Sequence, residues 1–159
     1  TLVCTLYEVW LDSHQDDGSS ETLVDNHETP TTWKYEALAA NWASIRNVRR
    51  VVTAALEIQR RDKVIGASLE AAPVVHVDDK DVLEALKTVA FDDLCITSGV
   101  MLTNDPAPAE AFRMGEVDGV AVVFEKAEGE KCERCWKILP DVGTHSHAGV
   151  CGRCDAALG

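Results

Sequence analysis

Four cysteines close to the end of the chain form two C-x-x-C pairs separated by fifteen residues, in the stretch KCERCWKILPDVGTHSHAGVCGRC. A two-residue gap lets both sulfurs of a pair face one point, and two such pairs can complete a tetrahedron around a metal ion. The surrounding segment has few apolar side chains, so a metal would have to replace the missing core. We therefore predict one structural Zn2+ held by four thiolates, those of Cys132, Cys135, Cys151 and Cys154.

Other uses of these thiols stay open on the sequence alone. Two disulfides or a thioredoxin-like redox pair would use the same cysteines, although no signal-peptide pattern opens the sequence and we expect a cytoplasmic chain with reduced thiols. Iron could take the place of zinc, and His145 or His147, which lie between the two pairs, could replace one cysteine. Cys4 and Cys95 lie in apolar runs and are expected to be small buried side chains.

The sequence predicts no catalytic centre. A zinc ion with four protein ligands has no position left for an activated water, so the metal would be structural. The motifs G-x-G-x-x-G, G-x-S-x-G and H-E-x-x-H are all missing from the sequence, and its adjacent acidic pairs are predicted at loop and helix-cap positions. The chain begins without methionine inside an apolar stretch, so we expect it to be a piece of a longer protein.

The charge of the chain is unevenly distributed. A formal net charge of -12 argues at first against nucleic-acid binding, because phosphate contacts come mainly from Lys and Arg. However, residues 33–64 carry seven basic and three acidic side chains, so a basic stripe can exist on an acidic protein. No run of 18 apolar residues occurs, and we expect no membrane partner.

A long helix is predicted from about Trp33 to Ile65, with Gly66 as its C-terminal stop. Apolar residues recur along it at helical spacing, namely Leu38, Trp42, Ile45, Val52 and Leu56. Five arginines fall within an arc of roughly 120° at about 100° per residue. This arc is either a solvated helix face or a track for backbone phosphates, and it comprises Arg46, Arg49, Arg50, Arg60 and Arg61.

The rest of the chain predicts an α+β protein in three regions. Residues 1–66 would hold an exposed acidic loop at 12–32 and the long helix, residues 67–125 a small α/β region, and residues 126–159 the zinc-binding module. The α/β region is expected to contain about three strands and one helix. The strands are predicted at 73–77, at 94–102 with a bulge at Gly99, and at 117–127; the helix is predicted from Asp78 or Asp79 to Val89, and a proline-containing connection at 103–112.

Several phrases together resemble the C-terminal part of bacterial isoleucyl-tRNA synthetases: KVIGASLEAA, CITSGV and above all KCERCWKILPDVG followed by VCGRC. The resemblance covers about Thr32 to Gly159, and TLYEVW extends it weakly into residues 1–31. It implies the end of a helical anticodon-binding domain, then a small α/β region and a four-cysteine zinc module. It also implies a parent enzyme that joins isoleucine to its tRNA using ATP. The ATP-binding catalytic domain and its H-I-G-H and K-M-S-K-S signatures are absent from this sequence.

The resemblance implies that this piece binds the anticodon end of isoleucine tRNA, beside the rest of the synthetase chain. Sequence-specific RNA recognition usually targets unstacked bases, with aromatic stacking and guanidinium contacts. A rigid zinc knuckle could present Arg134 and Trp136 in this way, although Trp136 could instead pack on the protein and Arg134 could simply be solvated. Lys131, Lys137 and Arg153 are further candidates for phosphate contacts.

Two other functions remain candidates on the sequence. Formamidopyrimidine-DNA glycosylases end in a similar four-cysteine finger, but neither their catalytic proline–glutamate N-terminus nor a helix–two-turn–helix domain is found here. The stretch KVIGASLEAA also favours the synthetase. A zinc ribbon that contacts another protein would suit the acidic charge and would need no RNA.

Overall fold

The computed structural model describes residues 35–159 of the chain. The predictions for the acidic loop 12–32, for Cys4 and for the TLYEVW stretch lie outside the described residues. We refer to residues 35–125 as the body and to residues 126–159 as the C-terminal module.

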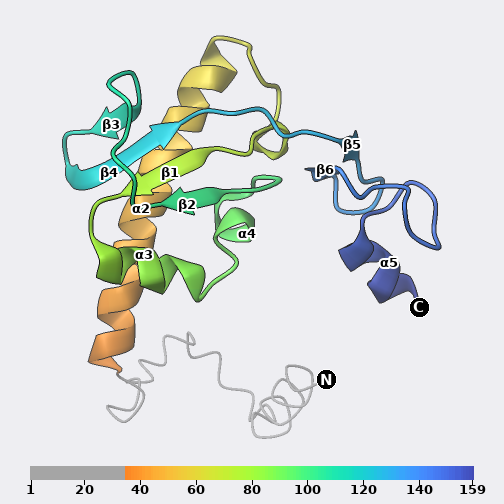
Figure 1. The fold of residues 1–159 in the computed structure, drawn as a ribbon, viewed down its shortest axis with the longest axis horizontal. Helices are drawn as coiled ribbons and strands as arrows, with labels where there is room; N and C mark the ends of the chain where they lie inside the picture. Colours follow the sequence, from red (N-terminus) through yellow and green to blue (C-terminus); the bar gives the residue numbers. More distant parts are fainter. Residues whose placement is uncertain (1–34) are drawn as a thin grey trace, which may run out of the picture. The chain divides into compact units, whose positions relative to one another are not determined.

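The described part contains both helices and strands, which confirms the predicted α+β class. In chain order its elements are α2 (Glu36–Arg61), the 3-10 turn η2 (Ser68–Glu70), β1 (Val74–Val77), α3 (Lys80–Lys87), α4 (Phe91–Cys95), β2 (Met101–Thr103), β3 (Phe112–Met114), β4 (Val117–Val123), β5 (Glu130–Lys131), β6 (Ile138–Leu139) and α5 (Gly152–Leu158). The C-terminal module holds β5, β6 and α5, and the body holds the rest (Figure 1).

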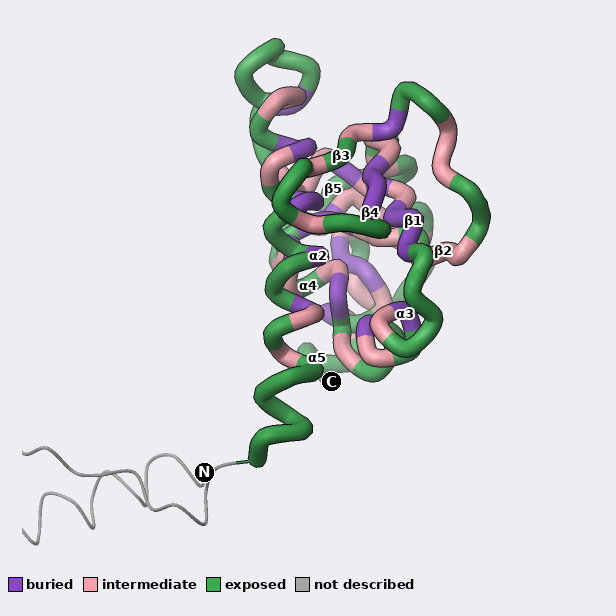
Figure 2. The backbone as a smooth tube through the Cα atoms, turned by 90° about the vertical axis from the view of Figure 1, so that its left-hand side faces the viewer, coloured by how far each residue is buried: buried purple, intermediate pink, exposed green. Residues whose placement is uncertain are grey.

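The body is a four-stranded sheet with α2 packed on one face. The strand order is β2-β1-β4-β3, with β1 and β2 parallel and the other neighbours antiparallel. Figure 2 shows the buried residues gathered between α2 and the strands. This core exists because α2 repeats aliphatic side chains at helical spacing while β1 and β4 alternate them, and it includes Val48, Val51, Val52, Leu56, Val75, Val77 and Val122.

The long helix differs from the prediction at its C-terminal end and in the extent of its apolar stripe. The helix ends at Arg61 rather than near Gly66, and Lys63 turns the chain with a φ of 59°. The apolar stripe begins at Trp42, because Leu38 is 54% exposed.

The predicted helix after the first strand is confirmed as α3, whose N-terminus is capped by the Asp79 carboxylate accepting from the amides of Asp81 and Val82.

The strand predicted at 94–102 is wrong except at its end, where Met101 and Leu102 belong to β2. Its first residues end the short helix α4, and Ile96 closes that helix in the left-handed region with a φ of 58°. Strand β2 begins only at Met101, and Gly99 forms no bulge; the sheet irregularity lies between Arg113 and Met114. A five-residue helix is too short to show a 3.6-residue period, so its apolar residues imitate a strand. The prediction also missed β3.

Candidate metal centre and nucleic-acid interface

The four predicted ligand cysteines lie together in the C-terminal module. Their Sγ atoms are all within 4.8 Å of one another, and those of Cys135 and Cys151 are 3.7 Å apart. A tetrahedron with Zn–S bonds of about 2.3 Å has edges of about 3.8 Å. Cys132, Cys151 and Cys154 are buried and Cys135 is half-buried. The arrangement therefore fits one Zn2+ with a closed coordination shell.

Backbone hydrogen bonds shape the first knuckle. The amide of Trp136 donates to the carbonyl of Cys132 at 2.9 Å, and the amide of Cys132 donates to the carbonyl of Lys137 at 2.8 Å. The second knuckle leads into α5, with Cys151 at its N-cap, and the Cys151 amide donates to Cys132 Sγ at 3.4 Å. Burial raises the pKa of Cys132, but N–H donors from Cys135, Cys151 and Arg134 outweigh it and lower the pKa to about 6. These donors favour the thiolate that a metal needs.

Neither histidine of the module belongs to the cysteine cluster. His145 Nε2 lies 2.9 Å from Asp141 Oδ2, and His147 Nδ1 lies 2.8 Å from Asp155 Oδ1. The pKa of Asp141 is lowered mainly by the hydrogen bond from the Gly152 amide and, to a smaller extent, by the hydrogen bond with His145. The histidines therefore brace the loop between the knuckles through carboxylates, and four-sulfur coordination is favoured over the alternative with a histidine ligand.

Three of the predicted RNA-binding residues are exposed on or beside the first knuckle. Trp136 is 60% exposed and has a φ of 67°, which is rare for a bulky residue. The Nζ atom of Lys131 lies 5.9 Å from the centroid of the Trp136 ring, within reach of a cation–π contact. Arg134 is exposed within the C-x-x-C turn itself. The knuckle thus presents to solvent an aromatic face with two cations beside it, next to the exposed carboxylates of Glu130 and Glu133.

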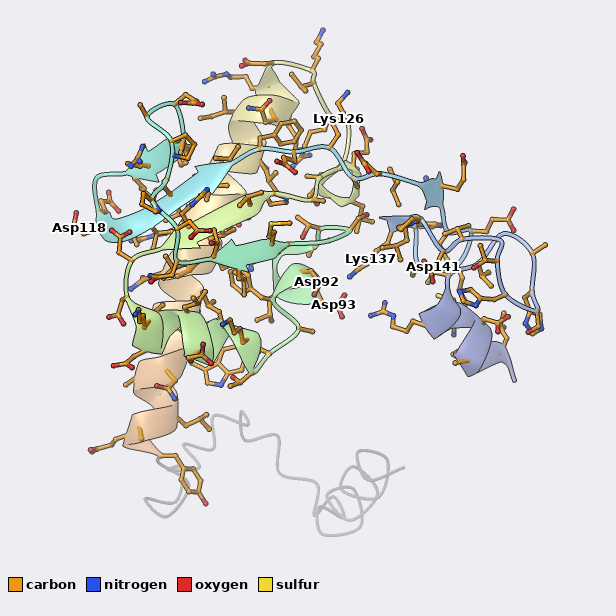
Figure 3. The ribbon with its side chains drawn as sticks, viewed as in Figure 1. Asp92, Asp93, Asp118, Lys126, Lys137 and Asp141 are labelled. Atoms are coloured by element: carbon orange, nitrogen blue, oxygen red, sulfur yellow. The ribbon has the colours of Figure 1, made fainter. Side chains whose placement is uncertain are left out.

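Lys137 and Arg153 both pair with carboxylates of the body, although Lys137 is buried and Arg153 is exposed. Lys137 is buried, and its Nζ lies 2.5 Å from Asp92 Oδ2 and 2.6 Å from Asp93 Oδ1 (Figure 3). Arg153 donates to Asp93 Oδ2 at 2.9 Å. The hydrogen bond from Lys137 lowers the pKa of Asp93. Because its ammonium is held by two carboxylates, Lys137 is not free to contact a phosphate in this structure.

Most of the α2 arginines also have partners within the protein. Arg49 Nε donates to the carbonyl of Leu94 at 2.6 Å, at the C-terminal end of α4. The other pairs are Arg50 with Glu116 at 3.5 Å, Arg60 with Glu57 at 2.7 Å and Arg61 with Asp62 at 3.2 Å. Arg46 is exposed and has no polar side-chain partner within residues 35–159. These partners leave few of the five arginines free for backbone phosphates, which favours the interpretation of this arc as a solvated helix face.

Residues that the sequence did not single out connect the C-terminal module to the body. The sequence predicts Asp92 and Asp93 only as loop or cap positions, but they bind side chains 45 and 60 residues away. The Ser98 hydroxyl accepts from the Ile138 amide at 2.7 Å and donates to the Leu69 carbonyl. No local sequence pattern predicts contacts between residues so far apart in the chain.

Comparisons with known proteins place the cysteine cluster in a defined class. Residues 129–157 match the family described as "zinc finger found in FPG and IleRS". Together with the sulfur geometry, this match supports one structural Zn2+.

Relatives extend the match beyond the finger. The chain is 66% identical over 99% of its length to the isoleucine–tRNA ligase of Ruegeria pomeroyi, and 48% identical over 97% of its length to that of Agrobacterium fabrum. A Brucella abortus protein of the same name is 48% identical over 87% of the chain. The chain spans about 16% of the length of the first two relatives and 14% of the third. The chain belongs to this family, as the C-terminal region of an isoleucyl-tRNA synthetase with its zinc finger.

No helix within residues 35–159 is both long enough and apolar enough to cross a membrane.

Proposed function

We propose that this chain binds the anticodon end of isoleucine tRNA, with Trp136 as the stacking surface and Arg134 and Lys131 as flanking cationic contacts. The observation that carries the proposal is the exposure of Trp136 on a knuckle fixed by four sulfurs. The Trp136 side chain is 60% exposed, so much of its apolar surface faces water, which is unfavourable. Its left-handed φ adds backbone strain. An unstacked base would cover this ring.

The proposed contact is small, and its cations alternate with the exposed carboxylates of Glu130 and Glu133. Stacking of one base on an aromatic ring contributes about 1–3 kcal/mol. Lys131 and Arg134 supply the two exposed cations beside the ring, and the neighbouring glutamates disfavour phosphates that approach without a stacked base. Arg46, which is exposed, is a candidate for a secondary phosphate contact, whereas Lys137 and Arg153 are left out of the proposal because both pair with carboxylates of the body.

The proposal extends to the parent protein. We infer that the whole enzyme joins isoleucine to its tRNA using ATP in the cytoplasm and that this region contributes binding but no catalytic group. The family description of the finger names FPG as well as IleRS. Relatives that match 97–99% of the chain carry the ligase name, which favours the tRNA-binding function over DNA repair.

The test is a fluorescence-anisotropy titration of the zinc-loaded chain with an isoleucine tRNA transcript. Trp136→Ala should weaken binding about tenfold, which corresponds to about 1.4 kcal/mol. Tyr35→Ala is the matched control, because Tyr35 is an aromatic residue that is 68% exposed and lies outside the C-terminal module; it should leave binding unchanged.

A transcript with a changed anticodon should bind the unmodified chain more weakly, and with this transcript the Trp136→Ala variant should bind as well as the unmodified chain. Equal affinity of the unmodified chain for both transcripts, or an unchanged affinity of the Trp136→Ala variant for the native transcript, contradicts the proposal. Tighter binding to damaged duplex DNA than to tRNA would favour the glycosylase-like alternative.

A further inference from the structure

The C-terminal module contacts the body through charged side chains gathered on the short helix α4. Asp92 and Asp93 lie in the first turn of α4, and both carboxylates face Lys137 of the module (Figure 3). Asp93 also accepts from Arg153, which lies in α5. Two carboxylates of the body therefore pair with two cations of the C-terminal module.

A buried polar contact accompanies this cluster. The Ile138 amide, in the strand that follows Lys137, donates to the hydroxyl of Ser98, and that hydroxyl donates to the Leu69 carbonyl. Ser98 is 4% exposed. Losing the module's side of this contact would leave a buried donor and acceptor without a partner, so Ser98 favours contact between the module and the body.

The position of Lys137 within the module is what makes the cluster relevant to Trp136. Lys137 directly follows Trp136, and its carbonyl accepts from the amide of Cys132 in the same knuckle. Its side chain is only 10% exposed, so its ammonium depends on the two carboxylates for compensation. Anchoring Lys137 therefore fixes the backbone from which the Trp136 ring projects.

We propose that Asp92 and Asp93 are positioning residues, which anchor the C-terminal module through Lys137 and Arg153 and thereby orient Trp136 toward RNA. This inference rests on the proposed tRNA-binding function for its second half only. Its first half, the anchoring, concerns the protein alone and is measured without RNA.

Amide hydrogen exchange, followed by NMR on the zinc-loaded chain, measures the anchoring. The Ile138 amide bonds across the contact to Ser98, whereas the Trp136 amide bonds within the knuckle to Cys132. In Asp92→Asn/Asp93→Asn the Ile138 amide should exchange at least about tenfold faster, because Lys137 loses its anionic partners. The Trp136 amide and the content of one zinc per chain should stay unchanged, which shows that the knuckle itself remains folded.

The RNA titration then measures the positioning, and the sign of the effect separates it from general electrostatics. Removing two negative charges should strengthen RNA binding slightly wherever they are removed. The charge-matched control is Glu110→Gln/Asp118→Asn, whose carboxylates are exposed and have no polar partner within residues 35–159. Asp118 lies at the end of the sheet away from the module (Figure 3).

Asp92→Asn/Asp93→Asn should bind isoleucine tRNA about three- to tenfold more weakly than this control, up to the loss expected from removing the ring. It should also distinguish less well between the native and the changed anticodon. Asp93→Asn alone, which removes the carboxylate shared by Lys137 and Arg153, gives a smaller change in the same direction if the double variant folds poorly.

The outcomes separate the two proposals. Faster Ile138 exchange with weaker tRNA binding supports the inference. Unchanged Ile138 exchange, or tRNA binding equal to or tighter than that of the charge-matched control, overturns it. Failure of the proposed function is seen independently, as an unchanged tRNA affinity of the Trp136→Ala variant.

Discussion

Replacing Gly129 with alanine adds a methyl group where the backbone leaves no room for it. Gly129 has a φ of 112°, and a Cβ built on it would lie 2.3 Å from both the carbonyl carbon and the carbonyl oxygen of Leu139. Leu139 is in β6 and pairs with Glu130 of β5. The added methyl group would therefore push apart β5 and β6, the strands that precede and follow the first knuckle.

The size of the effect follows from this geometry. Real Cβ atoms essentially never approach closer than 3.0 Å, so the backbones must separate by at least about 0.7 Å, the difference from 2.3 Å. Overpacking of this kind costs about 1–3 kcal/mol. A residue with a side chain at this φ adds about 1–3 kcal/mol of strain. We expect Gly129→Ala to destabilise the module by about 2–6 kcal/mol.

Gly143→Ala is the matched control, because Gly143 also has a positive φ, 81°, but a Cβ there would meet nothing within 4 Å. It should show the backbone strain without the steric clash. The assay is a urea titration of the zinc-loaded chain, with zinc release followed by a chromogenic chelator. At a slope of about 1–3 kcal/mol per M, the midpoint for Gly129→Ala should lie about 1 M below that for Gly143→Ala. Coincident midpoints for the two variants would refute the steric argument.

Three further predictions concern the core, the contact and the metal. Leu86→Ala removes a fully buried side chain and should cost about 2–5 kcal/mol in urea unfolding followed by circular dichroism, whereas exposed Leu38→Ala should cost under about 0.5 kcal/mol. Ser98→Ala leaves the Ile138 amide and the Leu69 carbonyl without their shared partner and should cost about 1–3 kcal/mol in the same assay; no loss would deny the contact. Removal of the zinc by a chelator should collapse the amide chemical-shift dispersion of the C-terminal module in NMR spectra and leave that of the four-stranded sheet unchanged. A module that keeps its dispersion after the zinc is removed contradicts this prediction.

The cysteine cluster and the long helix are the features that the sequence predicts best, because both depend on local spacing. A C-x-x-C turn brings its two sulfurs together within four residues, and a helix of 26 residues repeats its apolar period several times. The N-cap of α3 is equally local, since the Asp79 carboxylate reaches amides only two and three residues ahead.

The features that the sequence does not predict depend on distant partners or on very short elements. Helix α4 has five residues, and strand β3 has three, so neither shows a period. The role of Lys137 is set by carboxylates more than forty residues away, and a lysine beside a zinc knuckle is equally compatible with a phosphate contact. In the same way, Arg49 is predicted as part of a basic face, although its guanidinium closes the end of α4.

The most direct test of the account observes the Trp136 indole itself when RNA is added. In NMR spectra of the zinc-loaded chain, titration with the anticodon stem-loop of isoleucine tRNA should shift or broaden the indole N–H signal of Trp136. The indole signal of Trp42, which packs partly buried against the core, should remain in place. A Trp136 signal that stays unchanged while the stem-loop binds would contradict the claim that this ring meets the RNA.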